Sequence, residues 1–137
     1  MSPTELTLLG LIVWSLLLVM ALGGYRSLLV FKGEKAANGF NPSGEDMQGF
    51  GRRLTRAHAN CYEFLPLAGL LLVYAIAADQ QAATNGLAFA FLGARVLQSV
   101  THMISTNRTA VLVRFAFFIV QIGIIIIWLS TFLGGRS

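Results

Sequence analysis

Residues 6–25 read LTLLGLIVWSLLLVMALGGY, a run without a single charged side chain. A transmembrane α-helix needs about 20 predominantly apolar residues, and this run is about that long. Only one charged residue, Glu5, precedes it, so it lacks the basic segment that begins a secretory signal peptide. We therefore expect a retained membrane-spanning helix that continues to Phe31.

The composition of the whole chain supports the same class of protein. Of its 137 residues, 55% are hydrophobic and 12% are charged, whereas a soluble domain carries about 25% charged residues. A soluble domain of this length also has too small an interior to bury so many apolar side chains. The net charge of +4 comes from basic residues that are interleaved with the apolar segments. This distribution argues against a nucleic acid as partner, because no basic soluble face is present.

Polar segments divide the chain into four predicted membrane spans. The predicted spans cover residues 5–31, 51–78, 86–105 and 109–133. The longest predicted loop, residues 32–48, is rich in polar residues and glycine, and short polar turns follow the second and third spans. The sequence therefore predicts an all-α integral membrane protein, an up-and-down four-helix bundle that forms a single domain over residues 1–137.

The distribution of basic residues predicts the orientation in the membrane. Lys32 and Lys35 lie in the first loop and Arg108 lies in the third, whereas the second loop carries only Asp79. Cytoplasmic loops are enriched in Lys and Arg. We therefore expect the first and third loops in the cytoplasm and both termini on the opposite side. The sequence does not decide between a bacterial inner membrane and the endoplasmic reticulum.

Charged and polar side chains recur along one face of the second predicted helix. At about 100° per residue, Arg53, Arg56, Asn60 and Glu63 share one stripe. A charged residue at the bilayer centre costs roughly 2.5–3.5 kcal/mol on insertion scales, so such a stripe should face other helices or a wet cavity. His58 falls on the opposite side of the helix, where a packing or interfacial role is the simpler interpretation.

The third and fourth predicted helices each carry a similar stripe. The residues concerned are Arg95, Gln98, Ser99 and His102 in the third helix, and Arg114, Gln121 and Trp128 in the fourth. We expect the three stripes to meet in one polar site near the cytoplasmic side. Arginine outnumbers carboxylate there, and the rigid fork of a guanidinium suits a ligand that bears carboxylates.

Some of these residues also have simpler interpretations. Arg52 and Arg53 can act as topology anchors at the end of a span. Arg56 and Glu63 can belong to an interhelical ion-pair network that holds no ligand. Arg114 is the hardest to explain by structure alone, because its own helix carries no acidic residue. We therefore expect a functional role for Arg114.

Residues 53–63, RLTRAHANCYE, resemble the R-x-x-R-A-H-x-N-x-x-E signature of the MAPEG family, the membrane-associated proteins in eicosanoid and glutathione metabolism. Residues 64–67, residues 95–102 and the fourth helix over residues 114–128 are also similar to that family. The resemblance covers nearly the whole chain and is nearest to the shorter bacterial-type members. It implies a homotrimer of four-helix subunits that binds glutathione between neighbouring subunits.

The resemblance also implies roles for individual residues. The residues implicated in glutathione binding are Arg26, Arg53, Arg56, Asn60, Glu63, Gln98, His102 and Gln121. Arg114 matches the arginine that is thought to stabilise the glutathione thiolate. His102 stands where several members have a ligand-contacting tyrosine, and Ala59 stands where some have an arginine. Phe115 and Phe118 replace hydroxyl side chains of the prostaglandin synthase branch, so that activity is not expected.

The leading hypothesis is a glutathione-dependent membrane enzyme of the transferase or peroxidase type. A free thiol has a pKa of about 8.5, which a nearby cation lowers toward the reactive thiolate. Arg114 would supply this cation, and the thiolate would attack an apolar small-molecule electrophile that arrives from the bilayer. Cys61, the only cysteine, is not expected to act as nucleophile. It has no partner for an internal disulfide, and no metal-binding spacing is present.

Two other classes of function are consistent with the same residues. A protein without catalytic activity could bind an anionic lipid or an acidic metabolite in a basic pocket between the helices. A purely structural protein could use its polar stripes to hold helices and subunits together. Mutation of Arg114 separates these classes, because a structural role predicts a loss of assembly rather than a loss of ligand binding.

Overall fold

The computed structural model describes residues 1–135; Arg136 and Ser137, the last two residues of the predicted domain, lie outside the described residues. The helices are α1 (Pro3–Phe31), α2 (Gly49–Ala77), α3 (Ala82–Ile104) and α4 (Arg108–Gly134). No strand occurs in the described part of the chain. Each helix is long and apolar enough to cross a membrane. The prediction of an all-α fold is confirmed, and the four helices fit an integral multi-pass membrane protein.

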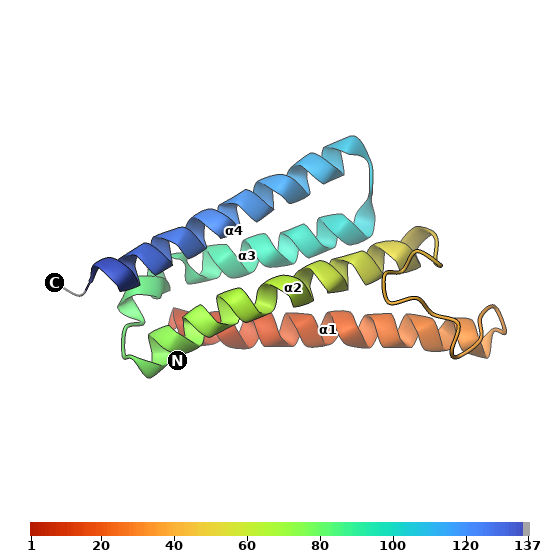
Figure 1. Cartoon of the computed structure of the whole chain (residues 1–137), viewed down its shortest axis with the longest axis horizontal. Coiled ribbons are helices and arrows are strands. Elements are labelled where there is room, and N and C mark those ends of the chain that lie inside the picture. The colour runs from red at the N-terminus through yellow and green to blue at the C-terminus, as the bar shows by residue number, and fades with distance from the viewer. Residues whose placement is uncertain (136–137) are drawn as a thin grey trace.

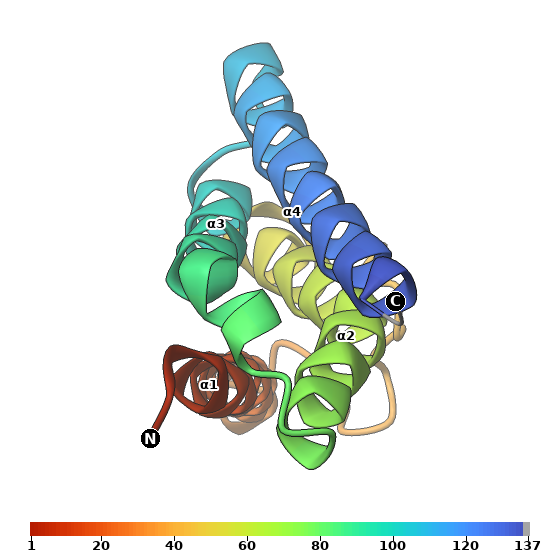
Figure 2. The same cartoon turned by 90° about the vertical axis from the view of Figure 1, so that its left-hand side faces the viewer.

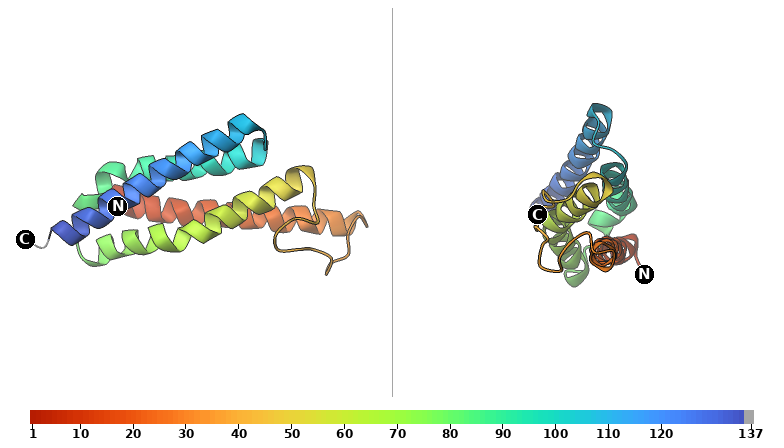
Figure 3. Two further views of the ribbon diagram at one scale, coloured as in Figure 1. Left: turned by 45° about the horizontal axis from the view of Figure 1, so that its top comes forward. Right: turned by 90° about the vertical axis from the view of Figure 1, so that its right-hand side faces the viewer.

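The two connections on the predicted cytoplasmic side lie at one end of the bundle. Figure 1 shows the α1–α2 loop and the α3–α4 connection at one end, and the α2–α3 turn near the N-terminus at the other. The further views in Figure 3 place the long α1–α2 loop beside the start of α2. The polar ends of α2, α3 and α4 that carry the candidate site residues are therefore gathered at the loop end.

Side-chain caps explain where two of the helices begin. At the start of α1, Glu5 N–H donates to Ser2 Oγ at 3.2 Å and Ser2 N–H donates to Glu5 Oε2 at 2.5 Å, which is a capping box. At the start of α4, Ala110 N–H donates to Asn107 Oδ1 at 2.8 Å. These contacts satisfy backbone N–H groups that have no partner inside the helix.

The third helix begins at Ala82, whereas the polar residues before Gly86 predicted a later start. Thr84 and Asn85 belong to the first turns of α3, where they bond to Thr4 of α1. The hydroxyl oxygens of Thr4 and Thr84 are 2.6 Å apart, and Thr4 Oγ1–H donates to Asn85 Oδ1 at 2.8 Å. Because α1 supplies their partners, these polar residues can be part of a helix rather than a turn.

Packing between the helices is uneven. The contacts of α4 are made mainly with α3, and its contacts with α2 are few. Figures 1 and 2 show that α4 leans away from α1 and α2 toward its own N-terminal end. Away from the loop end, the core contains Phe91 and Trp128. Both side chains are fully buried, and their ring centroids are 5.3 Å apart. The fourth helix is therefore anchored to α3 and diverges from α2 at the loop end.

Candidate functional site

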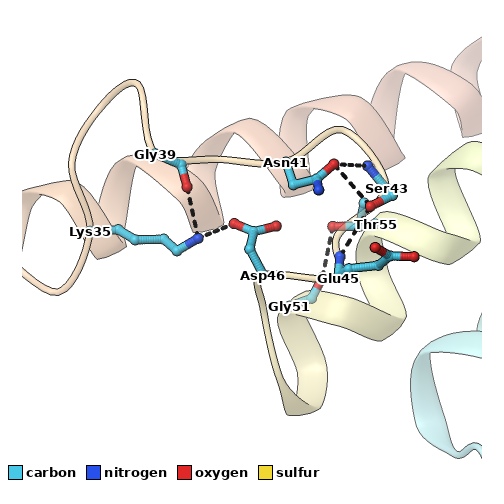
Figure 4. A network of polar contacts seen from close by, with 8 residues as sticks. All are labelled: Lys35, Gly39, Asn41, Ser43, Glu45, Asp46, Gly51 and Thr55. Carbon is cyan, nitrogen blue, oxygen red and sulfur yellow. Dashed lines mark hydrogen bonds and ion pairs between the residues drawn. The ribbon is translucent and has the colours of Figure 1, made fainter.

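Polar contacts hold the α1–α2 loop in a defined shape (Figure 4). Lys35 Nζ forms an ion pair with Asp46 and donates to Gly39 O at 2.9 Å. Asn41 Oδ1 accepts hydrogen bonds from the backbone N–H of Ser43 at 3.0 Å and from its hydroxyl at 2.9 Å. The hydrogen bond from Lys35 lowers the pKa of the Asp46 carboxyl below its usual value.

Gly44 packs directly against Thr55 of α2. Its φ of +74° is a left-handed conformation, and a Cβ at this position would lie 2.8 Å from both Cβ and Cγ2 of Thr55. Thr55 is buried, and its hydroxyl donates to Gly51 O at 2.9 Å, as Figure 4 shows. Only glycine meets both demands without strain. The close approach places the loop against the polar half of α2.

A cavity of about 420 Å³ lies between the start of α2, the end of α3 and the start of α4. Its lining residues are Gln48, Gly49, Arg52, Arg53, Arg56, His102, Thr106 and Arg114. We call it the basic cavity, since four of these side chains are arginines and none is a carboxylate. Guanidinium groups bind carboxylates and phosphates through paired, charge-assisted hydrogen bonds. The basic cavity is therefore suited to an anionic ligand.

A second cavity of about 330 Å³ shares Arg56 and His102 with the basic cavity. The lining residues are Ser43, Arg56, Ala59, Asn60, Glu63 and His102. We call it the side cavity. Glu63 is its only carboxylate, and Ala59 carries too small a side chain to fill it. The arginines of the basic cavity suit an anionic group, and Glu63 of the side cavity suits a cationic one.

The charged side chains that face these cavities have no ion-pair partner among the described residues. Between residues 1 and 135, the only ion pair is the one between Lys35 and Asp46 in the loop. The alternative interpretation, an ion-pair network through Arg56 and Glu63, therefore does not hold within the described residues. Arg53 is fixed by one contact, because its Nε–H donates to Met103 O at 2.7 Å. The other three arginines of the basic cavity make no such contact with the described residues, so their guanidinium groups can bind a ligand.

Two glutamines of the predicted site lie outside both cavities. Gln121 Nε2–H donates to Gln98 Oε1 at 2.9 Å and to Phe117 O at 2.9 Å. Gln98 and Gln121 are buried, with 4% and 0% of their surface exposed. They join α3 to α4 in the interior of the helix bundle. Their position thus differs from the prediction of a single site where all three polar stripes meet.

Arg95 also lies behind the cavities rather than in them. Its Nη1–H donates to Asn60 Oδ1 at 2.9 Å, and its Cζ lies 4.5 Å from the centroid of the Phe64 ring. Arg95 is 2% exposed, so its charge is shielded from solvent by these groups. Asn60 lines the side cavity with its amide held by Arg95. Arg95 therefore positions the Asn60 side chain and connects α3 to α2.

Arg26 lies apart from the other predicted site residues. It lines a separate cavity of about 520 Å³, formed by the end of α1 and the α1–α2 loop. Its Cζ lies 5.3 Å from the centroid of the Phe40 ring, a cation–π arrangement. Arg26 lines neither the basic cavity nor the side cavity.

The structure adds residues to the basic cavity that the sequence did not predict there. Arg52, which sequence reasoning left as a topology anchor or a site residue, lines the basic cavity. Its spacing of four from Arg56 was a usable signal, because such residues share a helix face. Gln48 and Thr106 also line it, but they lie just outside helices, where no helical periodicity predicts direction.

A comparison with protein families identifies the family of the chain. A model of the MAPEG family matches residues 4–133, a range that contains nearly all of the four helices. The chain belongs to the MAPEG family. This finding confirms the resemblance predicted from residues 53–63. Among curated proteins and among solved structures, the comparisons found no match.

In this MAPEG chain, residues of the second-helix signature line the two cavities along α2. Arg53 lines the basic cavity, Arg56 lines both cavities, and Asn60 and Glu63 line the side cavity. Arg114 comes from α4 and faces the basic cavity from the opposite side. The signature residues therefore line two adjoining cavities and do not serve only as a helix-packing surface.

Proposed function

We propose that the protein is a glutathione-dependent membrane enzyme of the transferase or peroxidase type. The observation that carries this proposal is the basic cavity, where four arginines face an open volume of about 420 Å³ and none forms an ion pair within the described chain. Unpaired charges in a membrane-spanning segment are costly, so a function that uses them is the simplest reason for their presence.

The chemical groups of glutathione match those of the two cavities. Glutathione has two carboxylates, one ammonium group and one thiol. Arg53 and Arg56 would bind the carboxylates, Glu63 would bind the ammonium group, and Asn60 would add a hydrogen bond. Each of these side chains lines the basic cavity or the side cavity. The binding residues are therefore assigned by charge complementarity.

Arg114 would have the catalytic role in this proposal. It faces the basic cavity from α4, and its helix carries no acidic side chain that could neutralise it. A guanidinium stabilises a thiolate more strongly where bound substrates exclude water than it would in bulk solvent. The thiolate of the bound co-substrate then attacks an apolar electrophile that enters from the bilayer.

Assembly and orientation in the membrane are part of the same proposal. The helices would cross the bilayer up and down, with the α1–α2 and α3–α4 connections in the cytoplasm and both termini on the other side. A homotrimer would hold glutathione between neighbouring subunits. The few contacts of α4 with α2 leave its surface available to another subunit. Arg26, which lines neither of the two cavities in its own subunit, would then contribute to the site of its neighbour.

One observation favours a second candidate function. Because the basic cavity has no carboxylate in its lining, it would also accept the phosphate of an anionic lipid or another acidic metabolite. In that case the protein would bind without catalysing a reaction. The two candidates differ in their need for Glu63, since a phosphate headgroup without an amine gains nothing from a carboxylate.

Calorimetric titration of glutathione into the detergent-purified oligomer tests the proposed function. We expect saturable binding that weakens at least tenfold in Arg56→Gln, which corresponds to about 1.4 kcal/mol or more. Lys32→Gln is the matched control, because this substitution also removes one positive charge but lies outside both cavities. Absence of binding at millimolar glutathione by the native oligomer, together with binding of anionic lipid, would support the second candidate.

A further inference from the structure

His102 occupies a distinctive position between the two cavities. It lies in the last turn of α3 and, with Arg56, is one of two residues that line both cavities. Arginine remains protonated and cannot accept a proton. Glu63 can accept one, but it lines only the side cavity. Among the described residues that line the basic cavity, His102 is therefore the one side chain that can act as a general base.

We propose that His102 accepts the thiol proton of glutathione and returns it to the leaving group of the electrophile. This inference rests on the proposed function and adds a catalytic residue to it. Arg114 would stabilise the negative charge on sulfur, but a guanidinium has no lone pair with which to remove the proton. The proton needs a separate acceptor, and His102 lines the same cavity as Arg114.

The charged groups around His102 make this role depend on bound glutathione. Those that line the cavities with it are Arg52, Arg53, Arg56 and Glu63 from α2 and Arg114 from α4; Ser43 and Thr106 carry no charge. A neutral imidazole has one ring nitrogen with a free lone pair, which can accept a proton. Bound glutathione brings two carboxylates that offset the guanidinium charges, so a pair of imidazolium and thiolate becomes favourable.

The proposed step balances in atoms and charge. A proton moves from the sulfur of glutathione to a ring nitrogen of His102, and the electron pair of the S–H bond stays on sulfur. That pair forms a C–S bond to the electrophile, while the bond from this carbon to the leaving group breaks and its electrons go to the leaving group. The leaving group then takes the proton from His102, which returns to its neutral form.

Proton counting tests this inference without a measurement of activity. Thiolate formation is followed by its ultraviolet absorbance, and proton release by calorimetry in buffers with different ionisation enthalpies. S-methylglutathione is the reference ligand, because it has the same carboxylates and amine but no S–H bond. For the wild-type oligomer, we expect glutathione to form thiolate with no more proton release than S-methylglutathione. The proton would then have stayed in the site.

Variants make the test specific to His102. In His102→Gln we expect retained glutathione binding, one extra proton released for each thiolate that forms, and a kcat for conjugation about 100-fold lower. His58→Gln removes the chain's other imidazole, which lines neither cavity, and should behave like wild type. Release of one extra proton per thiolate by wild type would overturn the role of His102 and leave the proposed function intact. Failure to bind glutathione would overturn both.

Discussion

Arg95 Nη1–H donates to Asn60 Oδ1 at 2.9 Å, a contact that joins α3 to α2 directly behind the side cavity. Asn60 is also a lining residue of that cavity, so the position of its amide is set from outside the site. The Arg95 guanidinium also lies over the Phe64 ring, with Cζ 4.5 Å from the ring centroid. Arg95 therefore links the packing of the bundle to the shape of the site.

Replacement of Arg95 should affect both stability and binding. In Arg95→Met, the Asn60 amide loses its hydrogen bond to the Arg95 guanidinium, and a hydrogen bond to a charged group contributes about 1.5–3 kcal/mol. We expect lower thermal stability in detergent and weaker glutathione binding, although Arg95 lines neither cavity. Arg108→Met, which removes an exposed arginine at the start of α4, is the matched control. Equal melting temperatures of the two variants would contradict the positioning role.

Gly44 should be less tolerant of substitution than another glycine with similar backbone geometry. Gly33 also has a positive φ, but no atom lies within 4 Å of a Cβ at that position. Gly33→Ala should cost about 1–2 kcal/mol from backbone strain. Gly44→Ala should cost a further 1–3 kcal/mol or so, because its methyl group overlaps Thr55. Chemical denaturation measures both, and equal losses would show that the loop does not pack on Thr55.

The ion pair between Lys35 and Asp46 predicts a small dependence of stability on pH. Because Lys35 lowers the pKa of Asp46 in the folded state, the pair stabilises the fold above the unfolded-state pKa of about 3.8. This contribution is lost as the pH falls through the lower folded-state pKa. Thermal unfolding of Asp46→Asn should therefore differ from wild type near neutral pH, and the difference should vanish in strong acid. Glu45→Gln, which lies beside it in the loop, should not show this pattern.

Arg52 should contribute to ligand binding, since it lines the basic cavity. Loss of one charge-assisted hydrogen bond to a carboxylate costs about 1.5–3 kcal/mol. Arg52→Gln should therefore weaken glutathione binding by roughly tenfold or more, with oligomer assembly unchanged by size-exclusion chromatography. Unchanged binding together with inverted topology in a loop-accessibility assay would instead identify Arg52 as a membrane anchor.

Helical periodicity explains why the second-helix stripe could be predicted. Rotation of about 100° per residue sets the relative directions of side chains on one helix, whatever that helix packs against. Arg53, Arg56, Asn60 and Glu63 were predicted to share a face, and they line two adjoining cavities. The four long apolar segments were likewise visible in composition and length.

Contacts between helices could not be predicted from helical periodicity. Periodicity places Gln98 and Gln121 on polar stripes, but only their 2.9 Å contact shows that they satisfy each other away from the cavities. Thr84 and Asn85 resembled a turn because their partner, Thr4, lies far away in sequence. The approach of the α1–α2 loop to α2 depends on Gly44, which a pattern of residue types does not reveal.

Ultraviolet difference spectroscopy of glutathione bound to the native oligomer tests the central claim most directly, because it reports ligand binding and thiol ionisation together. We predict a thiolate absorbance that saturates with glutathione in wild type. In Arg114→Gln, it should be lost while calorimetry still detects binding, since this arginine faces the cavity from α4 without an acidic partner on its own helix. Binding by wild type without any thiolate signal, or an equal signal in Arg114→Gln, would contradict the account.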